Sequence, residues 1–378
     1  MRTALEESTR EADLIGVDLR TRPLRVLTTI CLLIAIALSG ALASSADAAN
    51  PRPVKVMTYN LYLGADLTRA ITATTVPDFL NANATIFSNV QQTNFPERAK
   101  SLAREIADAD PTLLGLQEGA IWTTGPFNDP APATNVEYDF IASLRSELAA
   151  LGAPYDVVRI QKEADIEAPA GAPHFKDIRL QMHDAILVKA GLGSEVTLTN
   201  EQSANFVNRL VITTGLGQSI PVDRGWAAVD AVVNKRAFRF IDTHLEAFHP
   251  LIRLQQAQEL LAGPVASAPG KVVLVGDINS GPDLPVPANR LAYQALIAGG
   301  MVDTWPIANP GDPGPTAGFS ELLDDPSADV LDNRIDMVLT KGSVGVVQSR
   351  IYGTDSDNRT AGGLWPSDHA AVMATLTP

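Results

Sequence analysis

Short runs rich in β-branched and other apolar residues recur along this chain, and several follow one another with no helical segment between them. A doubly wound parallel sheet needs a crossover between successive strands, so this spacing predicts mixed or antiparallel sheets in an α/β fold. The runs predicted as strands are residues 54–59, 112–116, 155–160, 184–188, 227–233, 238–242, 271–275, 334–339 and 370–376. Helical periodicity is clearest at residues 96–107, 136–151, 251–261 and 288–298.

The length and composition of the chain fit one large domain. Its 378 residues are 46% apolar and 19% charged, which is ordinary for a globular protein that buries a substantial core. We therefore expect one catalytic domain over residues 50–378. Within it, residues 163–176 and the Pro/Gly-rich residues 306–332 are predicted to be surface insertions, because long segments without regular structure tend to carry binding function or to be mobile.

The first 49 residues indicate export. Arginines precede an uncharged run over residues 26–46, and the small residues Ala46 and Ala48 flank Asp47 as in a cleavage site. This pattern predicts a signal peptide in residues 1–49 and a secreted, extracellular protein. The alternative is an uncleaved membrane anchor, because 21 uncharged residues are just long enough to span a bilayer.

Cysteine and charge content exclude some classes of function. The one cysteine, Cys31, lies in the leader, so the mature chain has no thiol for catalysis or for a disulfide. Without residues 1–48 the chain keeps 24 Lys/Arg against 37 Asp/Glu, a formal charge of −13. A surface this acidic repels polyanions and argues against tight, non-specific binding of nucleic acid.

Five of the predicted strands end in, or run directly into, a carboxylate, an amide or an imidazole. These side chains belong to Asn60, Glu118, residues 242–244, residues 277–279 and Asp336. Each alone is more typical of a turn, a helix cap or a solvated acid than of a catalyst. Together with two histidines, and without a Gly-x-Ser-x-Gly motif, the set indicates activation of water at a hard cation.

Six motifs make the sequence resemble the endonuclease/exonuclease/phosphatase superfamily, which includes pancreatic-type deoxyribonucleases, abasic-site endonucleases, inositol polyphosphate phosphatases and neutral sphingomyelinases. The motifs are TYNLY (58–62), LLGLQEG (113–119), DTHLEA (242–247), VGDINSGP (275–282), RIDMVL (334–339) and PSDHAAV (366–372). They stand in the family's order. The resemblance implies a four-layer α/β sandwich, in which two mixed, mostly antiparallel sheets pack face to face between helices, with the active site at one edge.

The resemblance also implies a magnesium site and an attacking water. The Glu of the QE motif is the principal metal ligand in such enzymes, so Glu118 is expected to bind Mg²⁺, with Asn60 close by and Asp368 as an additional ligand. Mn²⁺ is the expected substitute. Asp277 resembles the residue that orients or deprotonates the attacking water, and Asn279 the residue that holds a phosphate oxygen.

The two histidines take complementary roles in the same family. His369 is expected to hydrogen-bond the phosphoryl oxygen, with Asp336 on its other ring nitrogen favouring the charged imidazole. His244 resembles the second family histidine, on the other side of the phosphate.

Two residues depart from the family pattern, and the role of a third can be interpreted in two ways. His183 and Asp184 stand where many members carry Gly and an amide or small residue, which leaves the phosphate contact there undefined. Arg224 is equally compatible with a salt bridge to a buried acid and with a phosphate contact.

The reaction implied is metal-assisted hydrolysis of a phosphodiester or phosphomonoester, while the substrate stays open between classes. The acidic mature surface and export favour a small or lipid-like phosphodiester, as in sphingomyelinase-like and phospholipase C-like enzymes. A secreted Mg²⁺-dependent nuclease is the second reading, and a catalytically silent binding module is the third. We expect a phosphoester ligand (lipid, small molecule or nucleic acid), a monomer and no obligate protein partner.

Overall fold

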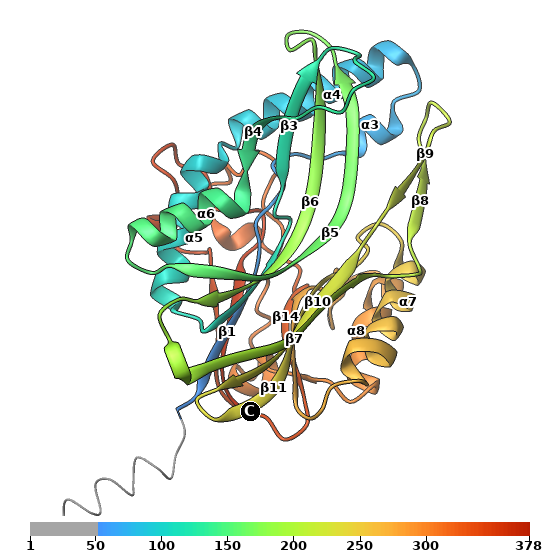
Figure 1. The fold of residues 1–378 in the computed structure, drawn as a ribbon. Helices are drawn as coiled ribbons and strands as arrows, with labels where there is room; N and C mark the ends of the chain where they lie inside the picture. Colours follow the sequence, from blue (N-terminus) through green and yellow to red (C-terminus); the bar gives the residue numbers. More distant parts are fainter. Residues whose placement is uncertain (1–51) are drawn as a thin grey trace, which may run out of the picture. The chain divides into compact units, whose positions relative to one another are not determined.

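The predicted strands assemble into two sheets in the computed structural model, which describes residues 52–378 (Figure 1). The larger sheet has the order β15 (Gly345–Tyr352), β16 (Ala371–Thr377), β1 (Val54–Asn60), β2 (Leu113–Gln117), β6 (Lys176–Lys189), β3 (Ile121–Pro126) and β4 (Asn135–Asp139), with β5 (Tyr155–Ala170) also paired to β6. The smaller sheet has the order β13 (Val302–Asp303), β14 (Asp336–Lys341), β12 (Val272–Asp277), β11 (Arg236–His244), β10 (Gly225–Val233) and β7 (Val196–Asn205). Strand β1 is parallel to β2 and β11 to β12, while the other pairings described are antiparallel. The prediction of mixed, mostly antiparallel sheets is confirmed.

Helices cover the outer face of each sheet and complete four layers. The larger sheet carries α4 (Val76–Gln92), α5 (Phe95–Ala109) and α6 (Phe140–Ala150), and the smaller carries α7 (Pro250–Leu260) and α8 (Leu291–Ala298). Between the sheets lies an apolar layer to which both contribute, with Val56 and Leu113 from one and Phe240 and Val273 from the other. The four-layer α/β sandwich implied by the sequence is therefore confirmed.

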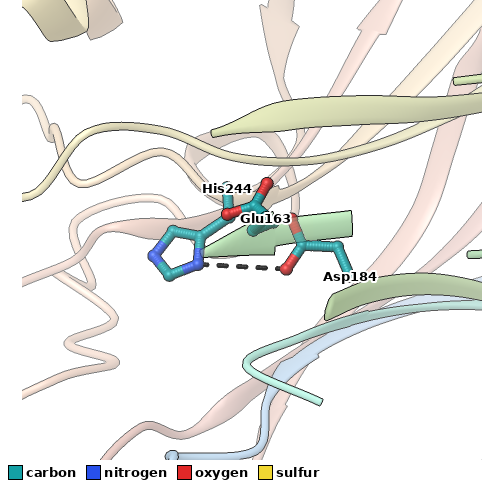
Figure 2. Close-up of side chains that lie close together, drawn as sticks. All are labelled: Glu163, Asp184 and His244. Carbon is teal, nitrogen blue, oxygen red and sulfur yellow. Dashed lines mark ion pairs between the residues drawn. The ribbon is translucent and has the colours of Figure 1, made fainter. Parts of the chain in front are cut away.

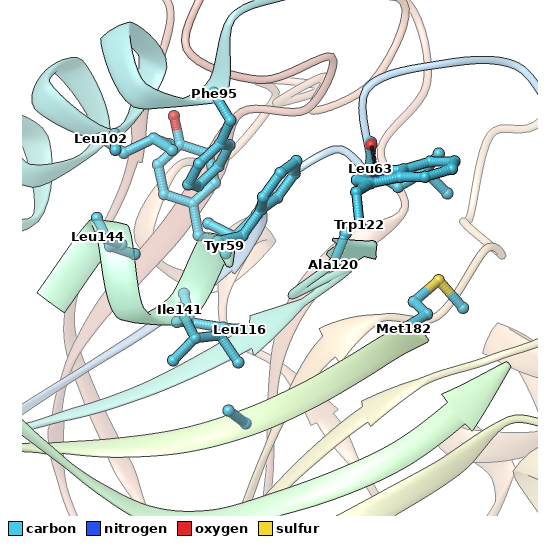
Figure 3. Close-up of a cluster of buried hydrophobic side chains, with 14 of the residues drawn as sticks. Tyr59, Leu63, Phe95, Leu102, Leu116, Ala120, Trp122, Ile141, Leu144 and Met182 are labelled. Carbon is cyan, nitrogen blue, oxygen red and sulfur yellow. Dashed lines mark hydrogen bonds between the residues drawn. The ribbon is translucent and has the colours of Figure 1, made fainter. Parts of the chain in front are cut away.

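Side chains along β1 point alternately to the two faces of the larger sheet, so the strand contributes to two hydrophobic clusters. Val54 and Val56 face the smaller sheet, whereas Met57 and Tyr59 belong to the cluster under the helices. Figure 3 shows that cluster, where Tyr59 lies with Phe95 of α5. Full burial of an aliphatic or aromatic side chain contributes roughly 1.5–3 kcal/mol, so this strand is held firmly from both sides.

Residues 163–176, predicted to be a surface insertion, are instead part of a long hairpin. Strand β5 continues through them to Ala170, and β6 begins at Lys176. The strand is hidden in the sequence because a bulge between Lys162 and Asp165 shifts the alternation and Pro169 interrupts it.

Other boundaries also differ from the prediction. The helix predicted from residue 136 begins at Phe140, because residues 135–139 pair with β3 and the Asp139 side chain caps the helix. The strand predicted from residue 334 begins at Asp336. Helix α4 and several edge strands were not predicted at all: the helix has amides and threonine among its residues, which lower helix propensity. Residues 306–332 are irregular as predicted, apart from short helical turns.

The leader predicted at residues 1–49 lies outside the described residues. From residue 52 to the last residue the chain forms one unit. No helix in this described part is both long and apolar enough to cross a bilayer.

Candidate active site

Strand register gathers polar strand ends at one edge of the smaller sheet. His244 stands opposite Asp277, and Asp277 stands opposite Asp336, on three neighbouring strands. Residues directly opposite each other point to the same face of a sheet, so these three side chains project together. Only glycine fits directly before Asp277, because the φ of Gly276 is +147° and an added Cβ would lie 1.9 Å from the Thr243 carbonyl oxygen.

Asp277 lies at the centre of this edge and is buried. Asn60, at the end of β1, donates from Nδ2 to Asp277 Oδ2 at 3.2 Å, and the backbone N–H of Asn279 donates to Oδ1 at 2.8 Å. The Nε2 atoms of His244 and His369 lie 3.4 and 3.9 Å from Oδ2. Burial alone raises the pKa of Asp277, but the imidazoles and the Asn279 N–H outweigh it and bring the pKa well below its usual range. Asp277 is therefore a carboxylate at neutral pH.

His369 and Asp336 form a hydrogen-bonded pair beside it. His369 Nδ1 lies 2.8 Å from Asp336 Oδ2, and its Nε2 lies 3.9 Å from Asp368 Oδ1. Burial alone lowers the pKa of His369, but Asp336 and Asp368 outweigh it and hold the pKa well above its usual value. The ring is therefore charged at neutral pH, with Nε2–H free to donate to an anionic oxygen.

Arg224 fixes the orientation of the His244 ring. Arg224 Nη1 lies 2.8 Å from His244 Nδ1 and 3.2 Å from Glu163 Oε2. A guanidinium can only donate, so His244 Nδ1 accepts from Arg224, and this places a ring N–H at Nε2, facing Asp277. Of the two roles that the sequence left open for Arg224, a salt bridge and a phosphate contact, the structure shows the salt bridge, to Glu163.

The departure from the family pattern at Asp184 is explained by its surroundings. Figure 2 shows Glu163 and Asp184 beside His244, with Asp184 Oδ1 4.0 Å from the ring Nδ1. Burial, together with nearby Glu163 and Asp242, raises the pKa of Asp184 well above its usual value. A carboxyl group that stays neutral does not repel a phosphate, so Asp184 is compatible with a phosphoester site.

Glu118 and Asp368 lie near enough at this edge for their charges to interact. Glu118 has a left-handed backbone, with φ of 55°, and its Oε2 accepts the Leu63 N–H at 2.7 Å. Burial raises the pKa of Asp368 to about 7, with His369 opposing the rise and Glu118 adding to it. Two carboxylates that repel each other in this way fit a shared hard cation.

Two other groups among the described residues each place three metal-capable atoms within 4.8 Å of one another. They are Glu163, Asp184 and His244, and Asp277, Asp336 and His369. Each already contains or touches a positive charge, from Arg224 in the first group and from the imidazolium of His369 in the second. A divalent cation therefore fits the Glu118 and Asp368 side better.

Arg98 on α5 holds the loops that carry these residues. Its guanidinium donates to the carbonyl oxygens of Leu61, Tyr62, Thr93 and Pro366 at 2.7–2.9 Å. The loop after Asn60 and the loop before Asp368 are thereby tied to one buried side chain.

Replacing Arg98 with methionine is expected to lower the free energy of unfolding by at least about 3 kcal/mol, because several buried carbonyls lose their donor. Urea unfolding measures it. Arg104→Met on the same helix is the matched control, since Arg104 is exposed and should change stability by less than about 0.5 kcal/mol. Equal losses in the two variants would mean that Arg98 is not an anchor.

All eight residues predicted for the site lie at this edge. A cavity of about 460 Å³ opens here, and Glu118, His244, Asp277, Asn279, Asp368 and His369 line it. Asn60 and Asp336 are fully buried behind Asp277 and His369. Sequence reasoning missed Glu163, which lies where the β-bulge between Lys162 and Asp165 interrupts the alternation of the strand.

The fold and the site define a metal-dependent phosphoester hydrolase class. The model of the Endonuclease/Exonuclease/phosphatase family matches residues 57–369, and the chain belongs to that family. Members of the family are divalent-metal-dependent hydrolases of phosphoesters. No curated protein sequence gives a significant match.

Several solved structures share the fold at low sequence identity. An endonuclease/exonuclease/phosphatase from Beutenbergia cavernae is 20% identical, with a TM-score of 0.53, and the match covers 86% of this chain and 71% of that one. A mannosyl-6-phosphatase from Bacteroides thetaiotaomicron is 15% identical, with a TM-score of 0.51 and coverage of 86% and 100%. D. rerio TDP2 complexed with single strand DNA product is 15% identical, with a TM-score of 0.50 and coverage of 86% and 99%. These similarities establish the fold and leave the substrate open.

Proposed function

We propose that this protein is an exported, Mg²⁺-dependent phosphodiesterase that acts on a small or lipid-like substrate. The observation that carries the proposal is the buried carboxyl group of Asp277, whose Oδ2 lies 3.4 and 3.9 Å from the Nε2 atoms of His244 and His369. A carboxylate suits the acceptance of a proton from water, and an imidazolium suits the charge that develops on a phosphoryl oxygen.

The chemistry follows from the directions of these groups. Asp277 Oδ2 orients the attacking water and takes up its proton as the water oxygen bonds to phosphorus. The P–O bond to the leaving alcohol breaks in the same displacement, and the leaving oxygen takes a proton from solvent. His369 Nε2–H and His244 Nε2–H donate to the phosphoryl group from two sides, and Asp336 keeps the His369 ring charged. Mg²⁺ held by Glu118 and Asp368, with Mn²⁺ as a substitute, would neutralise phosphate charge and polarise the phosphorus centre when bound.

The substrate class is supported by charge. The mature chain carries a formal charge of −13, which disfavours a long polyanion. A secreted nuclease is the second candidate, because the structurally similar D. rerio TDP2 is complexed with single strand DNA product. A panel of bis-p-nitrophenyl phosphate, sphingomyelin, inositol phosphates, plasmid DNA and RNA, each with Mg²⁺, decides between them. Turnover of DNA or RNA alone would favour the nuclease, and no turnover at all would contradict both.

Glu118→Gln is expected to weaken Mg²⁺ activation by at least about tenfold, because the substitution removes a charged oxygen ligand. The Mg²⁺ concentration that gives half-maximal rate on bis-p-nitrophenyl phosphate measures this. Glu105→Gln is the matched control, since Glu105 is buried in the core, where it accepts a hydrogen bond from Tyr59. Full activity of the wild type in excess EDTA would contradict the metal requirement itself.

Export predicts a defined mature N-terminus. Mass spectrometry of protein from the culture medium is expected to find a chain that begins close to Ala49, since Ala46 and Ala48 form the small-x-small site. Recovery of the full-length chain in the membrane fraction alone would support the anchor instead.

A further inference from the structure

The cavity at the active site extends well past the catalytic residues. Its volume of about 460 Å³ falls within the usual range for small-molecule sites, roughly 300–1,000 Å³. Away from the catalytic residues its wall is formed mainly by apolar side chains, among them Phe79, Ile86, Ile166, Leu180 and Ile220. We call this part the apolar chamber.

Residues of the main hydrophobic core form part of the wall of the apolar chamber. Leu63, Trp122 and Met182 belong both to the core cluster drawn in Figure 3 and to the cavity wall. Their side chains are packed on one side and face the cavity on the other. The chamber is thus rigidly walled on this side and does not need to form when a ligand arrives.

Three segments outside the six sequence motifs close the rest of the chamber. They are α3 (Thr68–Thr72) with α4, the outer half of the β5–β6 hairpin, and the hairpin of β8 (Leu210–Thr213) and β9 (Ser219–Val222). The segments hold one another through backbone bonds, from Gly215 N to Ile71 O at 2.9 Å and from Gly171 N to Leu80 O at 2.9 Å. Gly215 fits closely, since an added Cβ would lie 2.3 Å from the Ala73 carbonyl oxygen.

The charges on the cavity wall select against a second phosphate. Lysine is absent from the described residues that line it, and the guanidinium of Arg224 is paired with Glu163. Asp66, Glu167 and Glu321 also stand in the wall. A ligand that fits has one phosphate at the catalytic edge and an uncharged, apolar remainder, because a polyanion would meet acids or hydrocarbon.

We propose that the apolar chamber is a subsite for one alkyl or acyl chain of a phosphoester substrate whose phosphate lies between His244, Asp277 and His369. This inference rests on the proposed function. It narrows the substrate to single amphiphilic molecules that carry one phosphate group and an apolar chain. The chain leaves water for the chamber, so each buried methylene strengthens binding.

A series of n-alkylphosphonates from methyl to octyl tests the chamber. Each is measured as a competitive inhibitor of bis-p-nitrophenyl phosphate hydrolysis and, separately, by calorimetric binding to the intact protein. The inhibition and dissociation constants are expected to fall roughly threefold for each added methylene until the chamber is full. Equal constants for the methyl and octyl compounds, with normal turnover of the diester, would overturn the chamber and leave the proposed function standing.

Variants locate the effect. Ala168→Trp fills the chamber from β5 and is expected to weaken octylphosphonate binding at least about tenfold while methylphosphonate changes by less than about twofold. Ala149→Trp, on the exposed end of α6, is the matched control and should change neither. Ile220→Asp on β9 repeats the test with a charge if Ala168→Trp does not fold. Unchanged octylphosphonate binding in folded variants would overturn the proposed alkyl-chain subsite. If the wild type does not hydrolyse the diester, the proposed function is contradicted, and calorimetry still measures whether binding depends on chain length.

Discussion

Replacing Asp277 with asparagine is expected to lower kcat on bis-p-nitrophenyl phosphate by about a hundredfold or more, with KM little changed. The amide has nearly the same shape and keeps an oxygen for the Asn279 N–H, but it cannot accept a proton from water. Steady-state kinetics at saturating Mg²⁺ measure both constants.

The matched control for Asp277→Asn is Asp242→Asn in the neighbouring strand β11. Asp242 is also buried, but it does not line the cavity, and it accepts a hydrogen bond from Gln117 Nε2 that an asparagine oxygen can also accept. Burial raises the pKa of Asp242 well above its usual value, so the substitution removes little charge. We expect kcat within about threefold of wild type. A rise in KM with kcat preserved in Asp277→Asn would mean that Asp277 binds substrate and does not activate water.

His369→Ala is expected to lower kcat by about a hundredfold, and Asp336→Asn by less, because the second substitution leaves the ring in place. The double variant should be little worse than His369→Ala alone, since Asp336 has no imidazole left to orient. Four rates on one chromogenic diester test this coupling. Fully additive losses would show that the two residues act independently.

The same pair predicts a pH effect with a definite sign. The negative charge of Asp336 raises the pKa of His369, so removing it lowers that pKa. The charged ring is required at the transition state, and it is lost as pH rises through its pKa. The alkaline limb of kcat/KM is therefore expected to move to lower pH in Asp336→Asn. An unmoved alkaline limb would assign that limb to another group.

The mixed sheets could be predicted from the sequence because they depend on short local signals, whereas the active-site edge was implied by the resemblance that the six motifs carry. In the predicted strand 271–275, residues 272–275 form a continuous apolar run, and the polar residues soon after it lie at the strand end. In the folded sheet, the strand register places His244, Asp277 and Asp336 side by side.

What could not be predicted depends on contacts between distant segments. The outer half of β5 looks irregular in sequence because its bulge and Pro169 break the alternation, and its partner in β6 stabilises it only once the hairpin forms. The orientation of His244 depends on Arg224, which directly precedes the neighbouring strand β10. The apolar chamber forms where three separate segments meet, so no single sequence motif predicts it.

Hydrolysis of bis-p-nitrophenyl phosphate in water enriched in oxygen-18 tests the central claim most directly, because the claim is that Asp277 and His369 direct a water molecule at phosphorus. Mass spectrometry of the products is expected to find one labelled oxygen in p-nitrophenyl phosphate after a single turnover and none in p-nitrophenol. Asp277→Asn should give the same pattern at a far lower rate. Label in p-nitrophenol, or unlabelled p-nitrophenyl phosphate after a single turnover, would show that water does not attack phosphorus directly and would contradict this account.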